Sequence, residues 1–240
     1  MLWYKAWHES KTRFLYVMAG MTVLCGLLVF SYGSWGVDPA RINYSGFIWQ
    51  ALYFRFFHAA WVFSTLFLAL GGLAAERHHG SALFTLSLPA SRRRMLSVRA
   101  GVGAAEAVAA AVLPSAAISA FSLAIGHTYP VIPGLEFAML LAAGGMVFFS
   151  FGVLLSTLLP GDWAPLAVGI PAIAGLYSLT RHEPGLRWLN PQDLFSGAAH
   201  IQPPMWALNG TPPWAAIAAS LGIAAILLWV SVILAERLEF

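Results

Sequence analysis

Long runs of apolar residues, separated by short charged stretches, dominate the chain. Five intervals carry no charged residue between their ends: 13–38, 55–76, 136–162, 162–181 and 193–236. A helix rises about 1.5 Å per residue, so roughly 20 apolar residues cross a bilayer. The pattern predicts six helical spans, at 14–32, 50–75, 98–125, 135–159, 163–180 and 214–235. The third span includes one acid, Glu106.

Composition supports an integral membrane protein. Of the 240 residues, 59% are hydrophobic and only 10% are charged, whereas soluble domains carry about 25% charge. Six spans use most of this length and leave no room for a catalytic domain outside the membrane. We therefore predict a single all-α transmembrane domain over residues 1–240. A lone cysteine, Cys25, excludes an internal disulfide and a multi-cysteine zinc site.

The basic residues predict the orientation. Three lie on the predicted outer side and one, Arg55, lies inside a span. The other nine lie together on one side: Lys5, Lys11, Arg13, Arg77, Arg92, Arg93, Arg94, Arg99 and Arg237. Cytoplasmic loops carry an excess of Lys and Arg. Both termini and the 76–97 connection are therefore predicted to be cytoplasmic, and the loop 181–213 to lie outside.

The first thirteen residues have a helical apolar face. Trp3, Trp7, Ser10 and Phe14 recur at i, i+4, i+7 and i+11, with polar residues mostly on the other side. This pattern predicts a short amphipathic helix over 1–13 that lies in the membrane interface. A simple aromatic anchor for the first span is the alternative.

The predicted outer loop 181–213 is rich in proline. Its centre, Asn190-Pro191, has the pattern of a helix start, with a capping Asn before a Pro in the first turn. We expect short helices here rather than strands. A short helix that dips toward the membrane and a solvent-exposed loop both stay open.

The segment after the second predicted span has the signals of a compact helical hairpin. Glu76 closes the span, Gly80 breaks the chain, and Pro89 ends the short amphipathic helix between them. Ser91 can then cap a new helix that opens with arginines. A simple connecting loop would not need this combination of helix-breaking and helix-capping residues. The segment is therefore a candidate docking surface for a cytoplasmic partner.

This segment resembles the hallmark of the type 2 ABC-transporter permease family. The matching residues are Glu76, Gly80-Ser81, the Leu-rich stretch 83–88, Leu88-Pro89-Ala90-Ser91-Arg92, and Arg99. The family often has Gly-Lys where this chain has Val98-Arg99. The charged tail from Glu236 also resembles the family. The resemblance covers the whole chain in architecture, but its motif covers only residues 76–99.

The resemblance implies the permease subunit of an ATP-driven exporter in a bacterial inner membrane. Two permease copies, identical or related, form the pathway through their first and fifth spans, and two separate ATPase subunits bind ATP and Mg. The chain is then no enzyme and binds no cofactor or nucleic acid, and membrane lipid surrounds it; no phosphate-binding Gly-x-x-x-x-Gly-Lys-Ser/Thr motif occurs in it. The implied ATPase-coupling residues are Glu76, Arg77, Gly80, Ser81, Leu83, Phe84, Leu86, Pro89, Ser91 and Arg92.

Four ionisable residues inside spans are functional candidates because burial in a membrane is costly. Arg55 and Glu136 could pair near the outer side, although Glu136 could instead lie at the interface. Glu106 is expected to bond to a neighbouring helix or to an arginine of the coupling segment. His58 is expected to be a packing residue. No set of His and acidic residues has metal-ligand spacing, so no metal site is expected.

Two other function classes stay open. The first is a membrane-embedded lipid-modifying enzyme, which needs polar side chains at one depth. The second is an accessory membrane scaffold that does not transport. The substrate of an exporter is not specified either, because apolar, aromatic-rich spans suit lipids, amphipathic drugs or peptides equally.

Overall fold

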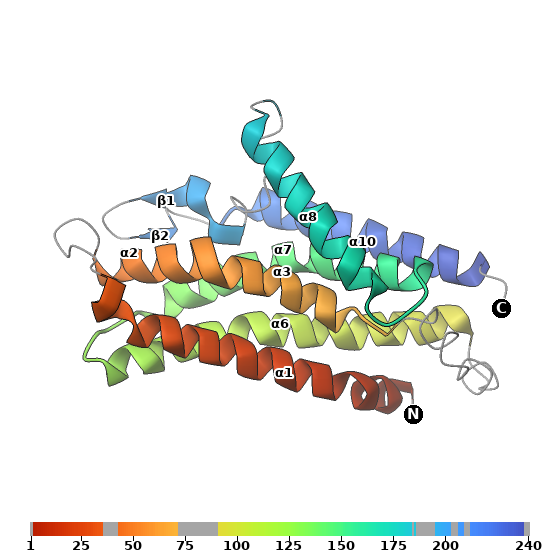
Figure 1. The fold of residues 1–240 in the computed structure, drawn as a ribbon, viewed down its shortest axis with the longest axis horizontal. Helices are drawn as coiled ribbons and strands as arrows, with labels where there is room; N and C mark the ends of the chain where they lie inside the picture. The colour runs from red at the N-terminus through yellow and green to blue at the C-terminus, as the bar shows by residue number, and fades with distance from the viewer. Residues whose placement is uncertain are drawn as a thin grey trace.

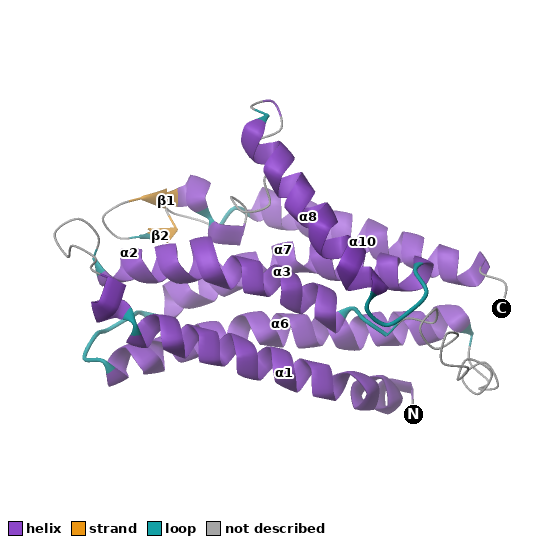
Figure 2. Cartoon of the chain, viewed as in Figure 1, coloured by secondary structure: helices purple, strands orange, loops and turns teal. Residues whose placement is uncertain are grey.

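The computed structural model describes residues 2–35, 43–71, 91–183, 185, 195–202, 206–208 and 212–237. Helices make up nearly all of this part of the chain (Figure 1, Figure 2). The main helices are α1 (Leu2–Phe30), α2 (Tyr44–Ile48), α3 (Phe57–Leu68), α6 (Arg92–Ala124), α7 (Val131–Leu158), α8 (Ala164–His182) and α10 (Trp214–Arg237). The short elements are η1 (Tyr32–Trp35), η2 (Trp49–Phe56), η4 (Ala198–His200), β1 (Ile201–Gln202) and β2 (Ala207–Leu208).

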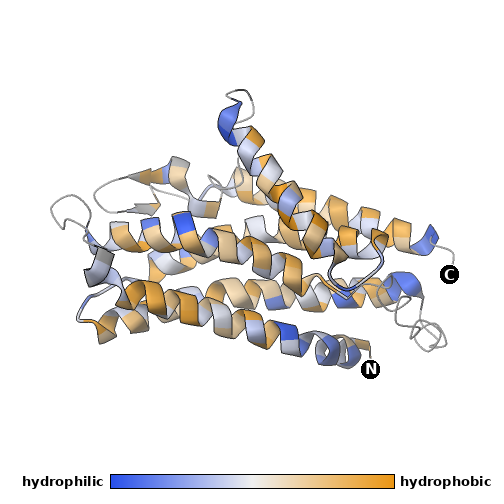
Figure 3. Cartoon of the chain, in the orientation of Figure 1, coloured by the Kyte–Doolittle hydropathy of each residue, from blue (hydrophilic) through white to orange (hydrophobic). Residues whose placement is uncertain are grey.

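Both chain ends lie at the same end of the helix bundle (Figure 1). The C-terminal end of α3 and the N-terminal end of α6 lie there too, and they flank residues 72–90. Hydrophilic residues gather at this end, whereas apolar residues cover the length of the helices (Figure 3). We call it the terminal end. The arrangement agrees with the predicted topology in placing the termini and this connection together.

The central helix is α7. In the most apolar stretch of α7, 78% of the residues are buried inside the bundle, compared with 22% in the corresponding stretch of α10. Trp61 of α3 donates a hydrogen bond from Nε1 to the carbonyl oxygen of Leu141, at 2.8 Å. Gly145 makes room for the indole, because a Cβ there would lie 2.4 Å from Nε1. Small residues on α7 thus let α3 pack closely, as is usual between helices in lipid.

Within the described part of the chain, four helices are long and apolar enough to cross a membrane: α1, α6, α7 and α10. A fifth crossing is added if the bent pair Tyr44–Phe56 and His58–Leu68 counts as one span. The chain has the character of a multi-pass membrane protein. Helix α8 takes the place of the predicted fifth span, but Gly, Pro and its terminal Arg181 lower its hydrophobicity. Six spans therefore stay a prediction.

The second predicted span begins earlier than expected and is bent. Its two halves, Tyr44–Phe56 and His58–Leu68, meet at 45°. Eight residues of the first half, η2, form a π-helix, which winds more widely than an α-helix and often marks a functional site. Asn43 begins this span, since its side-chain oxygen accepts a hydrogen bond from the Gly46 amide at 2.8 Å.

The prediction of a separate surface helix over 1–13 is wrong. The helix α1 continues unbroken from Leu2 to Phe30, so the amphipathic segment and the first span are one element. No Gly or Pro interrupts residues 2–19. Of the predicted apolar face only Ser10 is buried in the bundle, whereas Trp3 and Trp7 stay 61% and 41% exposed.

The prediction of helices rather than strands in the loop 181–213 is wrong in part. Strands β1 and β2 pair antiparallel, with Ile201 opposite Leu208 and Gln202 opposite Ala207. The 3₁₀ turn η4 precedes them. The proposed helix start at Asn190-Pro191 lies outside the described residues.

Candidate functional site: a polar cluster at the terminal end

The structure describes only the last two of the expected coupling residues. Glu76 to Pro89 lie outside the described residues. Ser91 caps α6, since its Oγ accepts a hydrogen bond from the Arg94 amide at 3.3 Å. Arg92 is the first residue of that helix. The predicted capping role of Ser91 is therefore confirmed.

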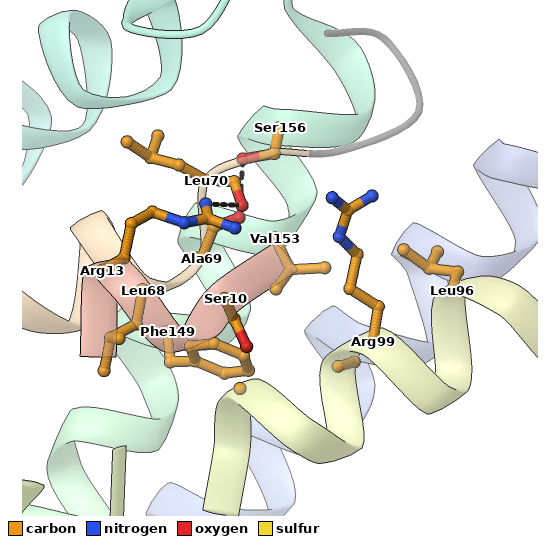
Figure 4. A pocket seen from close by; sticks show the side chains of 12 residues that line it. Ser10, Arg13, Leu68, Ala69, Leu70, Leu96, Arg99, Phe149, Val153 and Ser156 are labelled. Carbon is orange, nitrogen blue, oxygen red and sulfur yellow. Dashed lines mark hydrogen bonds between the residues drawn. The ribbon is translucent and has the colours of Figure 1, made fainter. Parts of the chain in front are cut away.

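A polar cluster lies where the chain leaves α3. Helix α1 contributes Glu9, Ser10 and Arg13, and α6 contributes Arg99 and Glu106 (Figure 4 labels Ser10, Arg13 and Arg99). We call these five residues the polar cluster. Three of them, Ser10, Arg13 and Arg99, line a narrow cavity together with Ser156 of α7 and apolar residues of α6, α7 and the C-terminal end of α3 with the two residues that follow it. The cluster thus joins the first helix to both helices that flank residues 72–90.

Side chains from two helices hold the backbone that leaves α3. Arg13 donates from Nη1 to the carbonyl oxygen of Leu70. Ser156 of α7 donates from Oγ to the carbonyl oxygen of Ala69 at 2.9 Å, and Figure 4 draws both bonds. Ala69 and Leu70 are buried, where an unpaired carbonyl would be costly. The chain entering residues 72–90 is therefore fixed to α1 and α7.

Gly71 lies between two guanidinium groups. A Cβ at this position would lie 3.1 Å from Nη1 and Nη2 of Arg13 and 3.1 Å from Nη2 of Arg99. The φ angle of Gly71 is 88°, in the region that favours glycine. Both space and backbone conformation require a glycine here. The last described residue before residue 72 thus has positive charge on both sides.

Glu9 links the two helices by charge. Its Oε2 lies 3.2 Å from Nη2 of Arg99 on α6, and its Oε1 lies 3.7 Å from Nζ of Lys5. These side chains are 24–36% exposed. Partly exposed ion pairs contribute only about 0–1 kcal/mol. The main effect of Glu9 is therefore to orient Arg99 beside Gly71, rather than to stabilise the fold.

Ser10 and Glu106 form the buried part of the cluster. Ser10 is 7% exposed and Glu106 is 3% exposed. Ser10 donates from Oγ to Oε1 of Glu106, and Oγ also lies 3.1 Å from the carbonyl oxygen of Ala6. Among the described residues, Oε2 of Glu106 has no hydrogen-bond partner. Of the two bonding partners predicted for Glu106, the neighbouring helix is the one observed.

The other intramembrane candidates lie apart from the cluster. Arg55 is exposed on η2 and Glu136 is half-buried on α7. Within the described residues no ion pair joins them, so the predicted pair is wrong. The π-helical winding of η2 changes the direction of each side chain relative to an α-helix and leaves Arg55 at the surface.

His58 packs against an aromatic ring. Its ring centroid lies 5.3 Å from that of Phe195, which agrees with the predicted packing role. Its Nε2 has no hydrogen-bond partner among the described residues. No group of three His, Cys, Asp or Glu side chains in the described ranges is placed to hold a metal ion.

Most of the polar cluster was not predicted from the sequence. Arg13 and Arg99 served only as basic residues that predict the orientation or, for Arg99, as part of a motif, and Glu9 only as one of the polar residues of the N-terminal helix. Ser10 was the available signal, because it is the one hydroxyl in a face of Trp and Phe residues. A hydroxyl on the apolar face of a membrane helix commonly bonds to a neighbouring helix.

Comparisons with known proteins add no family to this description. No protein-family model, curated protein or solved structure matches the chain.

Proposed function

We propose that this chain is the permease subunit of an ATP-driven exporter of the type 2 ABC class, with residues 76–97 as the segment that couples it to a separate ATPase. The observation that carries the proposal is the polar cluster. It fixes the backbone at Leu70 to α1, and through Glu9 and Arg99 it joins α1 to α6. Residues 72–90 are thus anchored at both ends.

A segment that is anchored in this way can transmit movement to the helices as a rigid lever. A partner that moves residues 72–90 would move α3 and α6 directly, and α1 and α7 through Arg13 and Ser156. A loosely attached loop would absorb such a movement. The hallmark residues between Glu76 and Arg92 supply the family resemblance, and the cluster supplies a mechanical reason for their position.

The proposed topology has six spans, with α8 as the fifth and both termini in the cytoplasm. Its support is the grouping of the termini at one end of the bundle (Figure 1) and the excess of basic residues there. The membrane is then the bacterial inner membrane, and the terminal end faces the cytoplasm.

The proposed assembly has two permease copies and two ATPase subunits. ATP and Mg bind to the ATPase subunits. Helices α1 and α8 would supply the contact between permease copies. Both expose large apolar side chains, among them Leu15, Leu27, Val168 and Leu179. A second copy or lipid must cover these side chains in a membrane.

The test introduces charge into the coupling segment. Leu83, Phe84 and Leu86 give the segment apolar side chains, and burying one of them in a partner is worth about 1.5–3 kcal/mol. We expect the double variant Phe84→Asp, Leu86→Asp to insert normally but to lose most co-purification with the ATPase and most ATPase stimulation. The matched control is Thr128→Asp, Ile132→Asp, which adds the same charges at exposed positions of the opposite end.

Full coupling by the first variant in a correctly inserted protein would refute the docking assignment. Co-purification of the wild-type chain with an ATPase that it never stimulates would favour an accessory scaffold.

A further inference from the structure

A groove runs along α6 beside α10, with a positive residue at one end. Its lining from α6 includes Arg93, Ser97, Gly101 and Ala104, and its opposite wall includes Trp229 and Val232 of α10. The α6 residues are spaced by four, four and three positions and so share one helix face. Arg93 to Ala104 covers about 16 Å at the helical rise.

Polarity changes along the groove. Arg93 and Ser97 are exposed near the start of α6, and the N-terminal end of α6 lies at the terminal end, where hydrophilic residues gather (Figure 3). Beyond Ser97 the lining is apolar, with small residues on α6 and the Trp229 side chain, 62% exposed, on α10. Among the described residues, no ion pair involves Arg93. The groove therefore offers a positive donor at its mouth and an apolar body.

We infer that this groove binds one anionic phospholipid. The phosphate of the lipid accepts hydrogen bonds from the Arg93 guanidinium and the Ser97 hydroxyl, and one acyl chain lies over Gly101 and Ala104 against Trp229. Arginine recognises phosphate well because its fork of donors matches two phosphate oxygens. Small residues on α6 leave the width that a chain needs, and the neighbouring bilayer supplies the lipid.

The positive charge of Arg93 at the mouth of the groove distinguishes between the molecules that could bind there. The exposed apolar face of α8 in a second copy could cover an apolar groove, but its Val168 and Leu179 side chains bring no negative charge to Arg93. A zwitterionic lipid offers phosphate together with a cation that Arg93 repels. An anionic lipid matches both ends of the groove. Basic residues at the predicted cytoplasmic surface also face the leaflet that is richest in anionic lipid.

The experiment measures lipid retention by the full-length protein in a neutral detergent, by native mass spectrometry. Phosphatidylglycerol and phosphatidylcholine with identical acyl chains are titrated separately. We expect phosphatidylglycerol to bind at least fivefold more tightly. The Arg93→Gln variant should lose about fivefold in phosphatidylglycerol affinity, as expected for one basic residue near a charged lipid, and little in phosphatidylcholine affinity.

Two further variants test the groove itself. Arg94→Gln removes the adjacent exposed charge, which does not line the groove, and should change affinity by less than twofold. Ala104→Leu fills the apolar body and should weaken both lipids alike, whereas Ala105→Leu, exposed and outside this groove, should not. Unchanged thermal melting of the variants shows that each is folded.

Equal affinity for the two lipids, or equal losses in Arg93→Gln and Arg94→Gln, would overturn the site. Displacement of the lipid by millimolar glycerol phosphate would overturn the membrane lipid as its occupant. A change of oligomeric mass in Ala104→Leu without loss of lipid would assign the groove to a contact between copies. The inference rests only on membrane insertion, so ATPase coupling is not part of the test and the proposed function stands or falls separately.

Discussion

At the terminal end, α1 and α6 are joined by an ion pair and by a hydrogen bond to a buried carboxyl group, whereas at the opposite end aromatic rings join η1, which follows α1, to α2 and to the connection after α6. Tyr44 stacks on His127 with ring centroids 4.6 Å apart and planes 12° apart. The Tyr32 ring is edge-on to both of these rings, and its centroid lies 5.0 Å from each of theirs. The Tyr44 hydroxyl donates to Oγ of Ser122 at 2.7 Å.

The opposite end, here called the aromatic end, contains a buried phenol. Tyr129, in the connection between α6 and α7, is 5% exposed, and burial raises the pKa of its phenol. The phenol therefore stays protonated at any physiological pH. Aromatic packing is short-ranged and salt does not screen it. The terminal end instead depends on charge and on bonds to backbone carbonyls, which a partner's movement or charge can change.

This difference separates two roles. The aromatic end should hold the helices together, and the terminal end should transmit movement from residues 72–90. Variants at the first end should lower stability and keep coupling. Variants at the second should lower coupling by more than their effect on stability accounts for.

The largest stability effect is expected from Phe47→Ala at the aromatic end. Phe47 is 3% exposed, and its ring lies 4.9 Å from that of Tyr32. In lipid the cavity left behind dominates, so we expect a loss of about 2–3 kcal/mol, below the about 3–5 kcal/mol known for soluble proteins. Thermal unfolding in detergent measures it. The fraction of the variant that stays folded should stimulate the ATPase nearly as well as the wild-type protein does. A large drop in stimulation would show that the aromatic end also takes part in coupling.

The next effect is expected from Arg13→Met at the terminal end. This change leaves the Leu70 carbonyl without its charged donor, which should cost about 1.5–2 kcal/mol. ATPase stimulation should fall several-fold, because the chain entering residues 72–90 is no longer fixed to α1. Arg13→Lys, which keeps the charge but not the forked donors, should recover part of both losses. Loss of stability with full stimulation would show that the cluster is structural only.

A smaller effect is expected for the buried pair Ser10 and Glu106. Single variants Ser10→Ala and Glu106→Gln and their double variant form a thermodynamic cycle, measured by unfolding. Hydrogen bonds between membrane helices average about 0.6 kcal/mol and reach about 1.7 kcal/mol. We expect a coupling energy near the upper value, because both side chains are buried. A coupling energy of zero would mean that Ser10 bonds to the Ala6 carbonyl instead.

The sequence predicts the helices well because apolar runs and charge breaks follow from the thickness of a bilayer. The predicted spans at 98–125, 135–159 and 214–235 overlap α6, α7 and α10 along most of their length. Ser91 was recognised as a cap because capping is local in the chain. These features depend on near neighbours alone.

The sequence did not predict contacts that depend on how one helix is rotated against another. The bond from Ser10 to Glu106 joins residues 96 positions apart, and that of Trp49 to the Ser196 carbonyl joins residues 147 apart. The Arg55 prediction failed because a π-helix cannot be read from hydrophobicity. The strand pair at 201–208 was missed because two-residue strands are too short for an alternating pattern.

The smallest effect is expected for the ion pair between Glu9 and Arg99. Its dependence on salt concentration distinguishes the terminal end from the aromatic end. The Debye length falls from about 10 Å at 0.1 M to about 3 Å at 1 M, so this partly exposed pair should weaken as salt rises. We expect the melting curve to report a loss below about 1 kcal/mol over that range. Glu9→Gln removes the attraction but leaves Arg13 and Arg99 on either side of Gly71. Since the repulsion between Arg13 and Arg99 exceeds the attraction of Arg13 to Glu106 or to Asp162, salt then screens a net repulsion, the sign should reverse, and the variant should gain slightly in stability with salt. The double variant Glu9→Gln, Arg99→Gln should show neither effect. Equal salt responses in wild type and Glu9→Gln would mean that the charges of the terminal end act no differently from the rest of the surface.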